Sequence, residues 1–152
     1  MPCIGANNAK HPLNALTGGT YIKTACVVTI DYGYADAFAY CVANSMKLFI
    51  IDSTAVQDAL IAMLQISYAY SNGAYRVDGL RDETGDNNWY TYGNGKTPAF
   101  SGMKWYDTSD TYTGYSSLMV TSMAYPMSKV ISTYLVDGIT LTTPFSFICE
   151  YV

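Results

Sequence analysis

Four cysteines are the residues whose chemistry is easiest to constrain from the sequence. They are Cys3, Cys26, Cys41 and Cys149, and no two of them form a CxxC pair. The usual spacing of a structural zinc site is therefore not indicated. An even number of cysteines fits two disulfide bonds in an oxidising compartment, and the alternative is a set of four buried free thiols.

Catalytic chemistry has little support in the sequence. The one histidine, His11, stands beside Pro12 in a stretch rich in Asn, Gly and Pro, where we expect an exposed side chain. No Ser–His or Cys–His nucleophile can be built around such a residue. The twelve acidic residues show no pairing of the kind that glycoside hydrolysis needs. We therefore expect a protein that is not an enzyme and that holds no cofactor.

The composition narrows the classes of partner. Charged residues make up 13% of the chain, against about 25% in an average soluble domain. Eight Lys and Arg residues with a net charge of -4 offer no basic patch for a nucleic acid. No apolar run reaches the length of a membrane span. The first residues lack the apolar core of a secretory signal, which fits either a cytosolic chain or a mature form whose signal has been removed.

Two helices are predicted in the first half of the chain. A strand over residues 25–32 precedes a helix on which Tyr34, Phe38 and Cys41 share one face, so Cys41 should point at the core. A short extended run over 47–52 leads to a second helix over 53–66, where Thr54 and Gln57 have the spacing of a capping box. Its apolar stripe comprises Val56, Leu60, Met63 and Leu64.

From residue 68 onwards the helical signals stop and short β-type runs follow. They cover residues 75–80, 116–123, 132–136 and 145–152, with clusters of Gly, Asn, Asp and Thr between them. Early helices and later strands predict an α+β fold with an antiparallel sheet. Residues 1–20 are expected to be an irregular lead-in, and 81–115 form a loop section long enough to suggest a functional role.

The order of these features resembles the C-type lectin-like domain family. The residues that carry the resemblance are Ala37, Tyr40 and Cys41, then Leu48, Ile51 and Ser53, then Gln57 and Leu60, followed by "VDGL" at 77–80, Trp89, Trp105 and "PFSFICE" at 144–150. The resemblance implies one C-type lectin-like domain over residues 26–152, with residues 1–25 as an N-terminal irregular segment. We expect self-association, with this N-terminal segment as the connector.

The resemblance also implies a disulfide pattern. Cys41 should pair with Cys149, and Cys3 with Cys26, as in long-form members of the family. A further family disulfide beneath the loop region is missing, because its positions are Ser117 and Leu141 here.

Calcium-dependent sugar binding in this family needs an E-P-N or Q-P-D tripeptide and a W-N-D tripeptide. The corresponding positions are Ser109, Asp110 and Thr111, and then Val136, Asp137 and Gly138, so Asp137 alone is a candidate ligand. A calcium ion takes six to eight oxygen ligands, and we therefore expect no such metal site. Asp82 and Asp86 resemble two ligands of a second, structural calcium site, but a solvated, turn-forming acidic loop is the favoured interpretation.

The function that the resemblance implies is recognition without catalysis. We expect a secreted, extracellular module that binds a glycan or protein ligand independently of calcium, through Tyr92, Asn94, Tyr106, Asp107 and Tyr112. Tyrosines in this loop section, which also include Tyr90 and Tyr115, could serve the core or a contact surface. The alternative function is a self-associating structural subunit of an extracellular matrix, fibre or adhesive layer, favoured by the low charge. A third is a cytosolic domain with reduced thiols.

Overall fold

The computed structural model describes residues 3–68, 73–106, 114–124 and 129–152, which form two helices and nine strands. The elements in chain order are β1 (Asn8–Asn14), β2 (Tyr21–Tyr32), α1 (Tyr34–Ala43), β3 (Met46–Leu48), α2 (Thr54–Ser67), β4 (Ala74–Arg81), β5 (Trp89–Thr91), β6 (Thr97–Pro98), β7 (Ser117–Ala124), β8 (Lys129–Ile139) and β9 (Phe145–Tyr151). The fold is α+β, as the sequence predicts.

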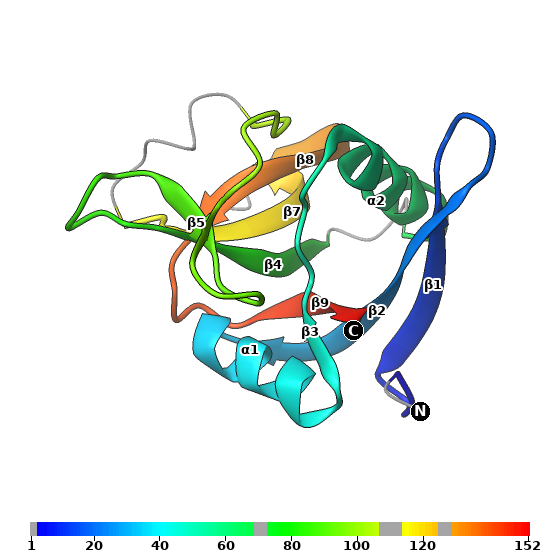
Figure 1. The fold of residues 1–152 in the computed structure, drawn as a ribbon, viewed down its shortest axis with the longest axis horizontal. Coiled ribbons are helices and arrows are strands. Elements are labelled where there is room, and N and C mark those ends of the chain that lie inside the picture. The colour runs from blue at the N-terminus through cyan, green and yellow to red at the C-terminus, as the bar shows by residue number, and fades with distance from the viewer. Residues whose placement is uncertain (1–2, 69–72, 107–113, 125–128) are drawn as a thin grey trace.

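The sheet is mixed and mostly antiparallel (Figure 1). Its main order is β1-β2-β9-β4-β5-β6, with β3 beside β9 and with β7 between β4 and β8. Strands β4 and β9 are the one parallel pair among the described strands. The C-terminal strand β9 therefore lies at the centre of the sheet, between β2 and β4.

Both faces of the central strands are covered, which explains their continuous apolar sequence. Val27 and Ile148 belong to a core that α2 covers, whereas Val28 and Phe147, one position along each strand, belong to a second core that α1 covers. Because side chains alternate between the faces of a strand, four consecutive residues in "ACVV" can all be buried.

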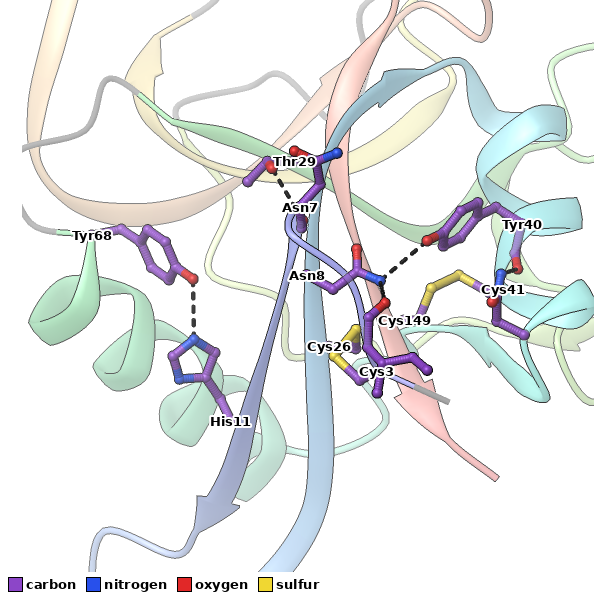
Figure 2. The surroundings of a disulfide bond; sticks show 12 residues. Cys3, Asn7, Asn8, His11, Cys26, Thr29, Tyr40, Cys41, Tyr68 and Cys149 are labelled. Atoms are coloured by element: carbon purple, nitrogen blue, oxygen red, sulfur yellow. Dashed lines mark hydrogen bonds between the residues drawn. A yellow bond between two sulfur atoms is a disulfide. The ribbon is translucent and has the colours of Figure 1, made fainter. Parts of the chain in front are cut away.

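The two disulfides lie in the core beneath α1 (Figure 2). Cys3 is bonded to Cys26, and Cys41 to Cys149, which are the pairs that the family resemblance implies. Cys26 and Cys149 stand directly opposite each other on the antiparallel strands β2 and β9. All but Cys3 are fully buried, so α1, the N-terminal segment and the last strand are joined at one place.

The N-terminal segment is more ordered than expected. Residues 8–14 form β1, which pairs with β2 along its whole length, so the prediction of an irregular lead-in over residues 1–20 is wrong there. The side chain of Asn8 donates to the Tyr40 hydroxyl on α1 at 3.1 Å (Figure 2). The predicted boundary between the N-terminal segment (1–25) and the C-type lectin-like domain (26–152) falls inside β2. This domain boundary stays a prediction.

The start of the second helix also differs from the expected capping box. Ser53 is the N-cap, and its hydroxyl accepts from the Val56 amide at 3.2 Å, while Thr54 is already the first helical residue. The side chain of Gln57 points away from the helix terminus and is 1% exposed. Neither helix of the described residues is long and apolar enough to cross a membrane.

Candidate functional site

The long loop section after β4 builds an open hollow lined mainly by aromatic and other apolar side chains. The hollow has a volume of about 300 Å³, and its lining consists of Asn88, Trp89, Tyr90, Pro98, Ala99, Phe100, Ser101, Met103, Trp105 and Leu118. The rings of Trp89 and Trp105 lie 5.2 Å apart between centroids and are tilted by 42°. Both rings are half-buried, so they pack on the core while keeping surface toward the hollow.

Strand pairing positions the two tryptophans. Trp89 begins β5 and stands opposite Arg81 of β4, whose guanidinium lies 5.8 Å from the Trp89 ring centroid. Trp105 forms a bridge with Val136 of β8, and the amide of the following residue, Tyr106, donates to the Val136 carbonyl at 2.8 Å. Residues 16 positions apart in sequence are thereby brought into ring contact.

Gln57 connects the loop segment at residues 102–104 to α2. Its amide nitrogen donates to the Gly102 carbonyl at 3.1 Å, and its carbonyl oxygen accepts from the Lys104 amide at 2.8 Å. Two backbone groups of the loop are thus satisfied by one buried side chain. Because Met103 lies between these two bonds, Gln57 fixes the segment that carries both Met103 and Trp105.

Asp78 holds the turn between β5 and β6, the two strands that carry Trp89, Tyr90 and Pro98 of the lining. Its fully buried carboxylate accepts from the Tyr92 amide, from the Gly93 amide at 2.7 Å and from the Tyr34 hydroxyl at 2.8 Å. Burial raises the pKa of Asp78, while these hydrogen bonds oppose that shift. Burial and the nearby Asp78 charge also raise the pKa of Tyr34, which keeps its hydroxyl protonated as a donor.

Three of the five predicted ligand-binding residues lie in the described part of the chain, and their surroundings differ. The amide of Tyr92 is used by Asp78, and Asn94 is exposed, with its side-chain oxygen accepting from Lys47 Nζ at 2.9 Å. Tyr106 is half-buried beside Trp105. Asp107 and Tyr112 lie outside the described residues, as do Ser109, Asp110 and Thr111.

The acidic loop forms a tight turn. Lys96 Nζ lies 3.4 Å from the Asp82 carboxylate, and the Asp86 carboxylate accepts from the Tyr90 hydroxyl and from the Asn88 amide. The bond from Tyr90 is the main cause that lowers the pKa of Asp86, and it raises the pKa of Tyr90. Among the described residues, no group of three or more Asp, Glu, His or Cys side chains is arranged to hold a metal ion.

A buried arginine, Arg76, contacts Ser117, one of the two positions that a disulfide joins in other members of the family. Arg76 donates to the Ser117 hydroxyl and to the carbonyls of Thr140 and Thr143, and it has no carboxylate partner within the described parts of the chain. Burial lowers its pKa to about 10. The other expected position, Leu141, is 44% exposed in the turn that Arg76 ties down.

His11 is better packed than the sequence suggests. Its ring is half-buried, contacts Tyr68 edge-on and lies 3.1 Å from the Tyr68 hydroxyl (Figure 2). Burial lowers the pKa of His11. The expectation of an exposed histidine is therefore wrong, and the ring joins β1 to α2.

Comparison with known proteins rests on structure. No protein-family profile matches the sequence, and no curated protein sequence matches it either. Human lithostathine matches with a TM-score of 0.63 over 97% of this chain and 98% of its own, at 14% identity. SPL-2, a Ca²⁺-independent C-type lectin from Saxidomus purpuratus, matches with a TM-score of 0.58 over 83% and 85%, at 16% identity. The C-type lectin domain of murine dendritic cell inhibitory receptor 2, in complex with an N-glycan, matches with a TM-score of 0.60 over 83% and 89%, at 14% identity.

The chain has the C-type lectin-like fold. At these identities the likeness concerns the fold alone, and the site must be argued from its own residues. Within this C-type lectin-like fold, the aromatic hollow and the turn held by Asp78 both belong to the long loop section after β4.

The calcium site of the family does not fit the residues present. Asp137, the one candidate ligand that is retained, is 1% exposed, and its carboxylate accepts from the Gly138 amide at 2.8 Å. The two residues beside it, Val136 and Gly138, have no side-chain oxygen. An ion that needs six to eight oxygens would find one buried carboxylate on this strand.

Sequence reasoning missed the residues that shape the hollow. Trp89 and Trp105 were singled out only for their resemblance to family positions, and Phe100 and Met103 carried no signal. Asp78 and Gln57 were also missed as loop anchors. Asp78 did offer one clue, because an acidic residue in the middle of the apolar run "YRVDGL" must be buried and hydrogen-bonded.

Proposed function

We propose that the protein is a secreted, non-catalytic recognition module that binds a neutral glycan in the aromatic hollow, without calcium. The observation that carries the proposal is the open hollow walled by Trp89, Tyr90, Phe100 and Trp105. A sugar ring presents C–H groups on one face and hydroxyls at its edge. Aromatic faces suit the first, and the polar groups of Asn88 and Ser101 in the same lining suit the second.

The structural likenesses support this choice of ligand class. One of the matched domains is described in complex with an N-glycan, and another is described as a Ca²⁺-independent C-type lectin. Those properties belong to those proteins, and we extend them to this chain as part of the proposal. The buried state of Asp137 supports binding without an ion.

The disulfide bonds support an extracellular location. Two disulfides persist in oxidising compartments and are rare in the cytosol. They join the N-terminal segment, α1 and β9, so the fold would depend on such a compartment.

A second candidate function is a self-associating structural subunit. The observation that favours it is a pair of exposed large side chains at the tip of the β1–β2 hairpin, where Leu16 is 66% exposed and Tyr21 is 57% exposed. Figure 1 shows this hairpin extending past the end of α2. Recognition and self-association would use different parts of the molecule.

Intrinsic tryptophan fluorescence tests the recognition proposal directly, because both tryptophans of the chain line the hollow. We expect a saturable change on titration with an asialo N-glycan or with a neutral oligosaccharide of N-acetylglucosamine, glucose or mannose. Tyr90→Ala, which removes an aromatic wall, should weaken binding about tenfold. Tyr21→Ala, a matched change on the distant hairpin, should leave the affinity unchanged.

Two outcomes would overturn the proposal. One is the lack of a saturable signal with any of these glycans. The other is an equal loss of affinity in Tyr90→Ala and Tyr21→Ala, which would mean that the hollow is not the site. Circular dichroism of each variant verifies that it is folded.

A further inference from the structure

A second hollow adjoins the aromatic one at β6. Its volume is about 250 Å³, and its lining consists of Ile50, Ile51, Asp52, Thr91, Asn94, Thr97, Pro98 and Phe100. Pro98 and Phe100 line both hollows. The two spaces are therefore separated by one short piece of chain.

The dividing piece is short and exposed. Strand β6 has two residues, Thr97 and Pro98, and both are exposed to solvent. Among the described strands it pairs with β5 alone and ends the sheet. A ligand that reached from one hollow into the other would cross the exposed Pro98.

The two hollows differ in chemistry. The first is walled by aromatic rings, whereas Asp52, Thr91, Asn94 and Thr97 give the second a polar lining. The side-chain oxygen of Asn94 accepts from Lys47, which leaves its amide N–H groups as donors. We refer to the first as the aromatic hollow and to the second as the polar hollow.

The charges around both hollows disfavour an acidic ligand. Each nearby lysine already pairs with a carboxylate. Lys23 lies 3.7 Å from Asp52 and 2.9 Å from Glu150, and Lys47 lies 3.5 Å from Glu150. Lys96 lies 3.4 Å from Asp82, and Lys104 lies 2.7 Å from Asp58. Asp52 lines the polar hollow, and Asp86 accepts from the hydroxyl of Tyr90 beside the aromatic hollow. Among the described residues, no cation here is left over to pair with an anionic sugar.

The volumes of the two hollows also favour a ligand that occupies both. Ligand sites usually have volumes of roughly 300–1,000 Å³. Each hollow alone is at or below the lower end of this range, whereas the two together fall within it. A ligand that fills both would bury far more surface than a single ring.

We propose that the ligand is a neutral oligosaccharide of at least two residues that crosses β6, with one sugar stacked in the aromatic hollow and the next hydrogen-bonded in the polar hollow. This inference rests on the proposed function and adds the class and length of the ligand. Asn94 is then a specificity-determining residue that acts on the second sugar only.

The experiment compares short and long forms of one sugar by tryptophan fluorescence. The monomer and the tetramer of N-acetylglucosamine, of glucose and of mannose are titrated into the wild type and into Asn94→Ala and Tyr90→Ala. For the sugar that binds, we expect the tetramer to bind more than tenfold tighter than the monomer, beyond the fourfold that counting equivalent residues could give. Asn94→Ala should remove this gain and leave the monomer affinity unchanged, while Tyr90→Ala should weaken both.

Equal affinities for monomer and tetramer, with no effect of Asn94→Ala, would overturn this inference and leave the proposed function standing. The lack of binding by every sugar would overturn both. A sialylated N-glycan should bind more weakly than its asialo form, and tighter binding of the sialylated form would contradict the choice of a neutral ligand.

Discussion

Asp78 is a buried acidic residue whose carboxylate is fully hydrogen-bonded. One buried carboxylate joins α1, through Tyr34, to the turn that carries Tyr92 and Gly93. A buried charge is costly unless it is hydrogen-bonded, and here each oxygen accepts at least two contacts. The turn between β5 and β6 therefore depends on a residue that lines neither hollow.

Asp78→Asn should keep this network and change its response to pH. The amide oxygen can accept from Tyr92 and Gly93, and the amide nitrogen can donate to the Tyr34 hydroxyl after that hydroxyl rotates. Because the folded pKa of Asp78 is raised above 3.8, the folded state binds the proton more readily than the unfolded state. The free energy of unfolding of the wild type should therefore rise relative to the variant as the pH falls from 7 through the raised pKa toward 3.8.

Urea unfolding of both proteins at a series of pH values measures this difference. Asp78→Ala, which leaves the buried N–H donors unpaired, serves as the disruptive control and should lose about 1–3 kcal/mol. A wild type that weakens relative to Asp78→Asn on acidification would show that the pKa of Asp78 is lowered instead.

At the scale of elements, α2 acts on the hollow through one glutamine. Gln57→Leu should cost about 1–3 kcal/mol, because the Gly102 carbonyl and the Lys104 amide lose their partner. It should also loosen Met103 and Trp105 and so shift the tryptophan emission and weaken glycan binding.

Asp58→Ala is the matched control for Gln57→Leu. Asp58 lies on α2 beside Gln57, and its carboxylate pairs with Lys104 of the loop section at 2.7 Å. This ion pair is largely exposed and should contribute less than about 1 kcal/mol to the free energy of unfolding. An Asp58→Ala variant that lost as much stability as Gln57→Leu would contradict the role given to Gln57.

The two disulfides should contribute unequally. The Cys41–Cys149 bond closes 108 residues and the Cys3–Cys26 bond closes 23, which corresponds to about 5 and about 3.5 kcal/mol in the chain-entropy description. Each bond is removed as a pair of Cys→Ser changes, because Cys26 and Cys149 lie directly opposite each other and a lone thiol could re-pair. Thermal unfolding should show the larger loss for the 41 and 149 pair, and equal losses would refute this ranking.

The strands that sequence reasoning found and those that it missed differ physically. Strands β2, β4 and β9 are rich in buried apolar residues and were predicted. Strand β1 contains Pro12 and two Asn residues, and it is a strand because it pairs with β2 and because Cys3 is bonded to Cys26. Strands β5 and β6 have three and two residues, too few for periodicity.

The candidate site was predictable only in part, because its geometry depends on contacts between different elements. A loop section was expected over residues 81–115, whereas Arg81 ends β4 and the short strands β5 and β6 lie within the section. The family-like tryptophans were identified. Their contact could not be predicted, because it depends on β4–β5 pairing and on the Trp105–Val136 bridge, which join residues far apart in sequence. The capping assignment of Gln57 failed because its side chain is used in a tertiary contact.

At the scale of the whole molecule, low charge and exposed apolar residues predict self-association. The N-terminal segment that we expected to connect copies is paired with its own sheet over residues 8–14, which counts against that part as the connector. The tip of the β1–β2 hairpin, where Leu16 and Tyr21 are exposed, is therefore the surface that we expect to join copies. Sedimentation velocity at high protein concentration should show oligomers that a Leu16→Ser, Tyr21→Ser double variant loses and that Val42→Ser, an equally exposed change on α1, retains. A wild type that stays monomeric would exclude self-association through this surface.

Recognition of a glycan without calcium is the claim on which the account depends most. It is tested most directly by calorimetric titration of the tetrasaccharide that binds, once with added calcium and once with a chelator. We predict the same affinity in both, because Asp137 is buried and its neighbours Val136 and Gly138 supply no side-chain oxygen to an ion that requires six to eight oxygens. Glycan binding that disappears with the chelator, together with calcium binding that is lost in a folded Asp137→Ala variant, would contradict the account.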